Sequence, residues 1–200
     1  MYKRQVSKED QIYVDLSRIG DLAPAGIYDL NKAIVKSSNN YFHMLFRKLI
    51  NQKRDNNTFI DSKIGLDRWS EYIKKFGLGS DLDFDISNMS SGFVPSSEYY
   101  DGFYGKGRWK FSNIYSLSIG QGELLVTPIQ MANIASIIAN RGYYYNPNIV
   151  THINGKKTSN NQRKYLGIDK IHFDYVVDAM ENVVTNGSAR RAYMRELMLC

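Results

Sequence analysis

Side chains suited to acid–base or nucleophilic chemistry are sparse in this 200-residue sequence, and they form no complete catalytic set. Neither Ser-x-x-Lys nor Gly-x-Ser-x-Gly occurs, so both common settings of an activated serine are missing from the chain. What remains is Ser37-Ser38-Asn39, which places a hydroxyl and a carboxamide two positions apart ahead of a predicted helix. A hydroxyl donates and accepts protons, and a carboxamide orients polar substrates. Small polar residues before a helix are nevertheless capping residues far more often than catalytic ones.

Metal-binding side chains have no suitable spacing. The single cysteine, Cys200, excludes an internal disulfide and a cysteine-rich metal site. The three histidines are scattered along the chain, and we expect them to be surface or core-edge residues rather than ligands: His43, His152 and His172.

Two glycine-rich stretches and one aspartate-rich stretch also lack residues that a ligand would need. GLGSD and IGQGE do not end in the Gly-Lys-Ser/Thr of a phosphate loop. Asp81, Asp83 and Asp85 alternate as in a calcium loop, but Ile86 and Gly92 stand where that loop needs glycine and glutamate. We therefore predict neither a metal nor an organic cofactor.

The composition is that of an ordinary globular domain with a mild basic excess. The chain has 26 Lys and Arg against 20 Asp and Glu, a formal net charge of +6. These basic residues form no long block and no stripe interleaved with aromatics, so a nucleic acid is a poor fit as partner. No apolar run is long enough to predict a transmembrane helix.

The clearest predicted helix spans residues 127–140. Thr127 is a good N-cap, Pro128 suits the first helical position, and Gln130 completes a capping box. Gly142 is expected to supply the left-handed stop. The predicted core-facing residues repeat at helical spacing: Met131, Ile134, Ala135 and Ile138.

Three further helices are predicted, over residues 61–76, over 169–185, and from residue 39 or 40 to about 50. Residues 80–115 have no steady period, and we expect them to be mostly irregular. Residues 143–153 are rich in β-branched and aromatic side chains and precede Asn154-Gly155, which favours a short hairpin. The sequence thus predicts a helix-rich chain with little strand.

Three blocks resemble signatures of the penicillin-binding transpeptidases, in that family's order. AIVKSSNNYF, residues 33–42, is similar to the family's Ser-x-Asn helix lead-in. FGLGSDLDFDISNMSSGFVPS, residues 76–96, resembles its connecting stretch, and IGQGELLVTPIQMANIASIIANRG, residues 119–142, resembles its Gly-Gln-Gly-Glu turn and following helix. The tail, residues 183–200, is similar to the lead into the family's Lys-Thr-Gly strand. The resemblance is greatest to class B enzymes of the cell-elongation type.

The resemblance implies an α+β fold related to the serine β-lactamases, present here as a helix-rich fragment that lacks most of the antiparallel sheet. It implies acyl transfer without a cofactor: a serine attacks the penultimate D-Ala of a peptidoglycan stem peptide, and an amine of a neighbouring stem takes the acyl group. β-Lactams acylate the same serine. The family works at the periplasmic face of the bacterial inner membrane, where the cell-elongation machinery is a candidate partner; no nucleic acid is involved.

The same resemblance gives two residues of this chain catalytic roles. Ser37 would pass a proton between the lysine beside the nucleophile and the leaving amine, and Asn39 would orient the substrate amide and that lysine. It assigns no chemistry to the side chain of Ser38. The nucleophile and the Lys-Thr-Gly motif are not in this sequence, because the sole Lys-Thr pair, Lys157-Thr158, is followed by Ser159.

We therefore expect residues 6–200 to be a partial transpeptidase domain truncated at both ends, with residues 1–5 a candidate non-native scar. Such a piece is expected to have no activity, to bind no penicillin covalently and to be marginally stable. Three rivals remain open: a non-catalytic penicillin-recognising sensor or structural relative of the same fold, a serine β-lactamase, and a basic glycan- or nucleic-acid-binding module.

Overall fold

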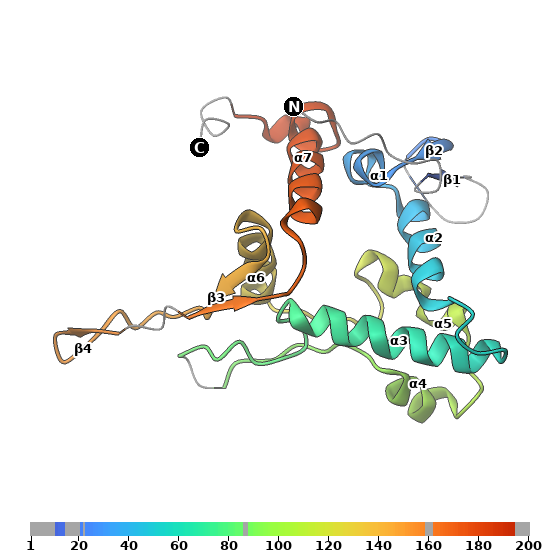
Figure 1. The fold of residues 1–200 in the computed structure, drawn as a ribbon, viewed down its shortest axis with the longest axis horizontal. Coiled ribbons are helices and arrows are strands. Elements are labelled where there is room, and N and C mark those ends of the chain that lie inside the picture. The colour runs from blue at the N-terminus through green and yellow to red at the C-terminus, as the bar shows by residue number, and fades with distance from the viewer. Residues whose placement is uncertain (1–10, 15–20, 22, 86–87, 159–161, 195–200) are drawn as a thin grey trace.

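The structure, a computed structural model, describes residues 11–14, 21, 23–85, 88–158 and 162–194. The helices are α1 (Leu30–Lys36), α2 (Asn39–Ile50), α3 (Thr58–Lys75), α4 (Ser97–Tyr104), α5 (Phe111–Ile114), α6 (Pro128–Ala139) and α7 (Lys170–Asn186), with 3-10 helices η2 (Tyr115–Ile119) and η3 (Arg190–Ala192). Figure 1 shows α1 and α2 on one side, α6 and α7 on the other, and α3 running beneath both.

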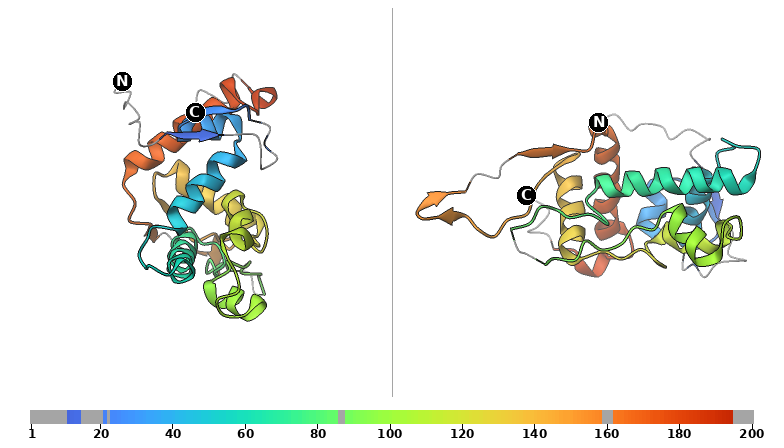
Figure 2. Two further views of the ribbon diagram at one scale, coloured as in Figure 1. Left: turned by 90° about the vertical axis from the view of Figure 1, so that its right-hand side faces the viewer. Right: turned by 90° about the horizontal axis from the view of Figure 1, so that it is seen from below.

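Strands are few and short, as the sequence predicts. β1 (Ile12–Val14) pairs with β2 (Gly26–Tyr28), and β3 (Tyr143–Tyr145) pairs with β6 (Arg163–Tyr165). β4 (His152–Ile153) pairs with β5 (Lys156–Lys157) across Asn154-Gly155, which confirms the predicted hairpin. All three pairs are antiparallel, so the described residues form a helix-rich α+β arrangement. The β4–β5 hairpin projects as an arm beyond the helices (Figure 2).

The start of α6 follows the prediction, but its end does not. The Thr127 hydroxyl accepts from the Gln130 amide nitrogen at 3.3 Å, and the Gln130 side chain accepts from the Thr127 amide at 3.0 Å, which completes the capping box. Arg141, with φ of 61°, takes the left-handed position that we expected of Gly142. The Gly142 amide then donates to the Ile137 carbonyl at 2.9 Å and closes the helix end.

The buried face of α6 also differs from the predicted apolar stripe. Its buried side chains are Gln130, Asn133 and Ile137, whereas Met131 is 52% exposed and Ala135 is exposed. The polar pair is buried because it binds the backbone of residues 76–91, as described below. Of the predicted stripe, Ile138 packs against a hydrophobic cluster and Ile134 is half-buried, whereas the prediction is wrong for Met131 and Ala135.

The stretch expected to be irregular, residues 80–115, contains α4 and α5. Ser96 caps α4 by accepting from the Tyr99 amide at 3.4 Å, and Tyr100 and Trp109 are both almost completely buried. They join the largest hydrophobic cluster of the described residues, whose buried members are Phe46, Ile50, Leu66, Tyr100, Trp109, Ile114 and Leu117. Tertiary packing of aromatic side chains overrides the weak local period here.

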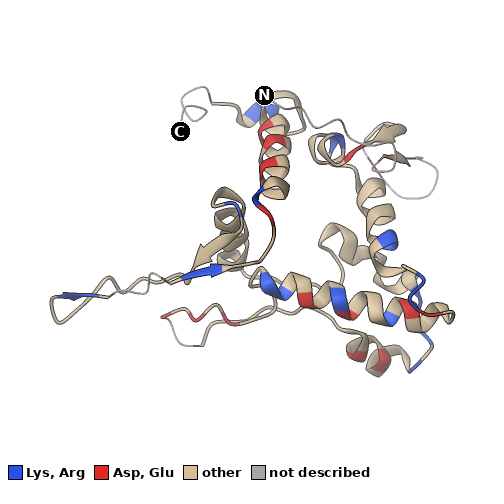
Figure 3. Ribbon diagram, viewed as in Figure 1, with Lys and Arg blue, Asp and Glu red and all other residues tan. Residues whose placement is uncertain are grey.

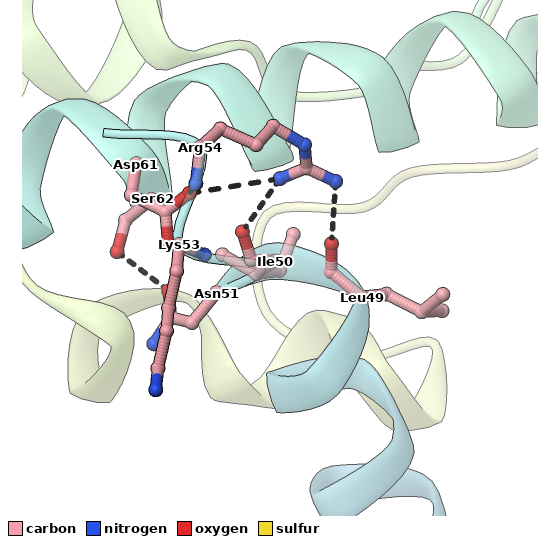
Figure 4. Close-up of polar contacts among 7 residues, drawn as sticks. All are labelled: Leu49, Ile50, Asn51, Lys53, Arg54, Asp61 and Ser62. Atoms are coloured by element: carbon pink, nitrogen blue, oxygen red, sulfur yellow. Dashed lines mark hydrogen bonds and ion pairs between the residues drawn. The ribbon is translucent and has the colours of Figure 1, made fainter. Parts of the chain in front are cut away.

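A close corner joins α2 to α3 (Figure 4). The Asp61 carboxylate accepts from the backbone amides of Lys53 and Arg54 at 3.0 and 2.8 Å, and the Arg54 guanidinium donates to the Ile50 carbonyl at 3.1 Å. A Cβ at Gly65 would lie 2.1 Å from the Ile50 carbonyl oxygen, so glycine permits this helix crossing. The corner fixes the far end of the helix that begins at the Ser-x-Asn sequence.

Charged residues of both signs are distributed over the described elements, as Figure 3 shows. Basic residues alternate with acidic ones along α3, and α7 carries Asp174, Asp178 and Glu181. Within the described ranges, no helix is both long and apolar enough for a membrane span.

Candidate functional site

The Ser-x-Asn sequence forms the joint between α1 and α2. Ser37 is the C-cap of α1 in the left-handed conformation (φ 53°, ψ 50°), and its amide donates to the Ile34 carbonyl at 3.1 Å. The Ser37 side chain is exposed. Ser38 is the N-cap of α2, and Asn39 is the first residue of that helix. The helix start predicted at residue 39 or 40 is confirmed, but Ser37 ends the preceding helix rather than capping the next one.

Ser38, to which we assigned no chemistry, is the most enclosed residue of the three. It is 0% exposed, its hydroxyl accepts from the Tyr41 amide at 3.3 Å, and the same hydroxyl donates to an Asp21 carboxylate oxygen at 2.9 Å. A side-chain oxygen in this position satisfies one of the unpaired amides of the first helical turn. The middle residue of the motif is therefore what fixes the turn.

Asp21, which precedes α1 in the sequence, binds the same turn through its carboxylate. Its carboxylate also accepts from the backbone amides of Asn40, at 2.9 Å, and Ala23, at 3.0 Å. Burial alone would raise the pKa of Asp21, but hydrogen bonds from the amides of Ala23, Asn40 and Asn39 and from the Ser38 hydroxyl lower the pKa below its ordinary value. The carboxylate thus stays ionised at the start of α2, where a negative charge is favourable.

The body of α2 contacts the segment that precedes the Gly-Gln-Gly-Glu turn. His43, one turn into α2, is 4% exposed and lies against Tyr115 and Ser118 of η2. The expectation that His43 is a surface or core-edge residue is therefore wrong, whereas His152 and His172 are exposed. The histidine links the helix that begins in the first family-like block to the segment directly before the third.

The Gly-Gln-Gly-Glu turn itself is held from α4. The Tyr100 hydroxyl donates to the Glu123 carboxylate at 2.6 Å, and burial together with this bond raises the pKa of Tyr100 far above its ordinary value. Gly120 and Gly122 both have positive φ, 71° and 77°, which permits the tight reversal.

The second and third family-like blocks are bonded to each other through α6. The side-chain nitrogen of Gln130, Nε2, donates to the carbonyls of Ser80 and Ser91 at 3.1 and 2.7 Å. Phe93 and Leu125 exchange backbone hydrogen bonds of 2.7 and 2.9 Å. The second and third blocks recognised in the sequence are therefore bonded directly to each other, and α2, which begins in the first block, contacts the segment before the third through His43.

The C-terminal part of the described chain returns to the Ser-x-Asn turn. The Ser188 amide donates to the Val35 carbonyl at 3.3 Å, and Gly187 is so close that a Cβ there would lie 2.7 Å from the same oxygen. Val35 is two residues before Ser37. Residues 195–200, which lie in the tail that resembles the lead into a Lys-Thr-Gly strand, are outside the described residues, as are residues 1–5.

Ser37 and Asn39 lie at a turn that hydrogen bonds hold in place. The surface pocket described next is not at this turn. One pocket of ≈ 650 Å³ lies at the α2–α3 corner, between residues that include Arg47, Lys53 and Asp61. In the described part of the chain no group of three or more His, Cys, Asp or Glu is placed to hold a metal ion. The turn itself offers hydrogen-bonding groups alone, a hydroxyl and a carboxamide.

Sequence reasoning missed Asp21 as a residue that fixes the turn. Asp21 is 17 positions from Ser38, and nothing in the local pattern links the two. Ser38 was counted among the capping residues before the helix but was not singled out, and the structure shows that it is the N-cap.

The chain belongs to the family of penicillin binding protein transpeptidase domains, which matches residues 3–196. Among curated relatives, it is 28% identical over 172 residues to the peptidoglycan D,D-transpeptidase MrdA of Acinetobacter baumannii, covering 82% of this chain and 23% of the relative. It is 31% identical over 130 residues to MrdA of Haemophilus influenzae, covering 65% of this chain and 18% of the relative. The chain thus spans about a fifth of the length of these relatives.

Solved structures agree with this family. Pseudomonas aeruginosa PBP2 in complex with WCK 5153 superimposes with a TM-score of 0.70 at 25% identity, over 90% of this chain and 39% of that one. Helicobacter pylori PBP2, in a complex with MreC, superimposes with a TM-score of 0.66 at 20% identity, over 94% of this chain and 33% of that one. The predicted fold, a helix-rich piece of the transpeptidase fold, is confirmed.

Proposed function

We propose that this chain is the Ser-x-Asn part of a peptidoglycan D,D-transpeptidase of the cell-elongation type, acting in a longer protein. The observation that carries the proposal is the turn at residues 37–39, in which Ser38 is locked by Asp21 and the two neighbouring residues are presented at a helix junction. The similarity to MrdA relatives supports the substrate class, stem peptides that end in D-Ala-D-Ala.

In the proposed reaction, a serine from a Ser-x-x-Lys segment outside this sequence attacks the carbonyl carbon of the penultimate D-Ala. The amide C–N bond breaks, the terminal D-Ala leaves as an amine after gaining a proton, and an acyl-enzyme forms. An amine of a neighbouring stem then attacks the ester, which releases the serine and forms the cross-link. β-Lactams are expected to acylate the same serine and to remain bound.

Within this scheme the two residues of the turn have supporting roles. The Ser37 hydroxyl accepts a proton from one partner while it donates to another, so it relays the proton toward the leaving amine. The Asn39 carboxamide orients the substrate amide and the lysine beside the nucleophile. Their fixed backbone is useful because a relay depends on short, aligned hydrogen bonds.

Location and partners belong to the same proposal. The longer protein is expected to work at the periplasmic face of the bacterial inner membrane, as part of the cell-elongation machinery. The Helicobacter pylori PBP2–MreC complex, which has a similar fold, supports the choice of partner.

The proposal is tested by labelling with a fluorescent penicillin. The 200-residue chain is expected to remain unlabelled, because it contains no Ser-x-x-Lys, and the longer protein is expected to be labelled. In the longer protein, Ser37→Ala and Asn39→Ala are each expected to slow acylation roughly 100-fold, whereas Ser112→Ala, at an exposed position of α5, is the control. An unlabelled longer protein would favour a non-catalytic relative of the same fold, and labelling of the 200-residue chain would exclude the proposed source of the nucleophile.

A further inference from the structure

One carboxylate, that of Asp21, binds several groups around the Ser-x-Asn turn. One oxygen accepts from the Ser38 hydroxyl and from the Asn40 amide, both at 2.9 Å, and the other accepts from the Ala23 amide at 3.0 Å. Positions 38 and 40 flank Asn39, and position 38 directly follows Ser37, so the carboxylate is bonded next to both residues proposed to act in catalysis. Asp21 therefore fixes the backbone on both sides of Asn39 and directly after Ser37.

The turn needs such a support because its conformation is not intrinsically favourable. Ser37 has a positive φ of 53°, a region that side chains other than glycine adopt at a cost of about 1–3 kcal/mol. Ser38 is fully buried and Asn40 is 5% exposed, so their donor groups must be paired within the protein. Asp21 provides an acceptor for both.

The bonds also determine where the side chains of the turn point. The Ser38 hydroxyl donates to Asp21 and accepts from the Tyr41 amide, so its rotamer is fixed by two partners. With Ser38 and Asn40 held, the backbone is fixed on both sides of Asn39 and directly after Ser37, which constrains the Cα–Cβ directions of both residues. A displacement of about 1 Å at such a position is enough to reduce a rate roughly 100-fold.

We propose that Asp21 is a positioning residue for the Ser37–Asn39 pair, holding both side chains in the orientation that acyl transfer requires. This inference deepens the proposed function and rests on it. Asp21 touches neither substrate nor nucleophile in this proposal; it acts through Ser38 and Asn40. Replacement by asparagine keeps the size of the side chain but removes one of the two acceptor oxygens and the charge.

The matched control is Asp29→Asn. Asp29 also caps a helix of the same region, because its side chain accepts from the Lys32 amide at 2.8 Å at the start of α1, but it makes no recorded bond to the turn. Both substitutions remove a capping carboxylate, so a loss of stability common to both reports on helix capping alone.

The experiment has two readouts. In the longer protein, the acylation rate constant at saturating penicillin is measured separately from the penicillin concentration that gives half-maximal rate. Asp21→Asn is expected to lower the rate constant roughly 10- to 100-fold with little change in the half-saturating concentration, while Asp29→Asn leaves both close to those of the unmodified protein. In the 200-residue chain, hydrogen exchange at the Asn40 amide is expected to quicken in Asp21→Asn and not in Asp29→Asn.

Equal rate constants for Asp21→Asn and Asp29→Asn, in a longer protein that is itself acylated, would overturn the positioning role and leave the proposed function intact. A longer protein that penicillin does not acylate would overturn the proposed function, and the inference would fall with it. If Asp21→Asn does not fold, Ser38→Ala replaces it as the test variant. It removes only the hydroxyl contact, and an unchanged rate constant in that variant would equally count against the proposal.

Discussion

The Nδ1 atom of His43 lies 2.5 Å from the hydroxyl oxygen of Ser118 and 3.2 Å from the carbonyl oxygen of Tyr115. The His43 and Tyr115 rings also contact each other, with centroids 5.2 Å apart. Because His43 follows the Ser-x-Asn turn on α2 and Ser118 precedes the Gly-Gln-Gly-Glu turn, this single side chain connects the helix of the proposed catalytic pair to the segment before that glycine-rich turn. Its other ring nitrogen, Nε2, is buried with no hydrogen-bond partner recorded among the described residues.

The buried histidine is expected to make folding sensitive to mild acid. Burial lowers the pKa of His43, and the Tyr115 carbonyl and the Asp21 carboxylate only partly oppose that effect. The unfolded chain therefore takes up a proton more readily than the folded chain, so stability should fall as the pH decreases through about 6.5, the ordinary histidine pKa. Thermal melts of the 200-residue chain between pH 7.5 and 5 measure this slope.

His43→Phe should reduce the slope, since phenylalanine does not titrate and retains a ring against Tyr115. His152→Phe, on the exposed β4 strand, is the control and should keep the slope of the unmodified chain. An identical slope in unmodified and His43→Phe proteins would show that other groups govern the acid sensitivity.

Tyr100 and Glu123 are expected to contribute a second, alkaline sensitivity. The pKa of Tyr100 is raised in the folded chain, so the stability that it provides is complete below pH about 10 and is lost as the pH rises further. Tyr100→Phe leaves the Glu123 carboxylate without this donor and should cost about 1.5–3 kcal/mol at neutral pH. Denaturant melts of Tyr100→Phe beside Tyr72→Phe, whose side chain is 57% exposed, check the prediction; equal losses would refute it.

Two glycine-to-alanine changes are expected to have opposite effects on stability, one at the α2–α3 crossing and one inside α4. Gly65→Ala places a methyl group 2.1 Å from the Ile50 carbonyl, which forces the helices apart and should cost about 3 kcal/mol or more. Gly102→Ala, inside α4, meets no heavy atom within 4 Å and should instead stabilise by about 0.5–1 kcal/mol. Melting temperatures of the two variants are compared, and a tolerated Gly65→Ala would mean that the helices are not in such close contact.

Replacement of Gln130 even by glutamate is expected to lower the free energy of unfolding. The change keeps the acceptor that caps the Thr127 amide but removes the donors to the Ser80 and Ser91 carbonyls and buries a charge. We expect a loss of about 2 kcal/mol or more at neutral pH. Gln121→Glu, in an exposed position of the Gly-Gln-Gly-Glu turn, should be nearly neutral in the same denaturant melts; comparable losses would argue against a buried donor role.

Local signals in the sequence were enough for the boundaries of α2 and α7 to within a residue, whereas α3 begins at Thr58, three residues before its predicted start. The Thr127 capping box and the Asn154-Gly155 hairpin appear as predicted, because both depend on neighbouring residues only. The core side of α6 could not be predicted in the same way, since Gln130 and Asn133 are buried by bonds to residues about 40 to 57 positions away. The Ser-x-Asn pair was found by resemblance, whereas Asp21 became visible only through its contacts in space.

The hydrogen bond from the Ser188 amide to the Val35 carbonyl joins two residues that are 153 positions apart in the sequence. Closing a chain of that length costs about 4 kcal/mol in entropy, more than one such bond returns. The buried Ala33, Val35 and Ala179 side chains of α1 and α7 must supply the remainder. We therefore expect the contact between α1 and α7 beside the Ser-x-Asn turn to form late in folding, after the intervening helices have shortened the distance.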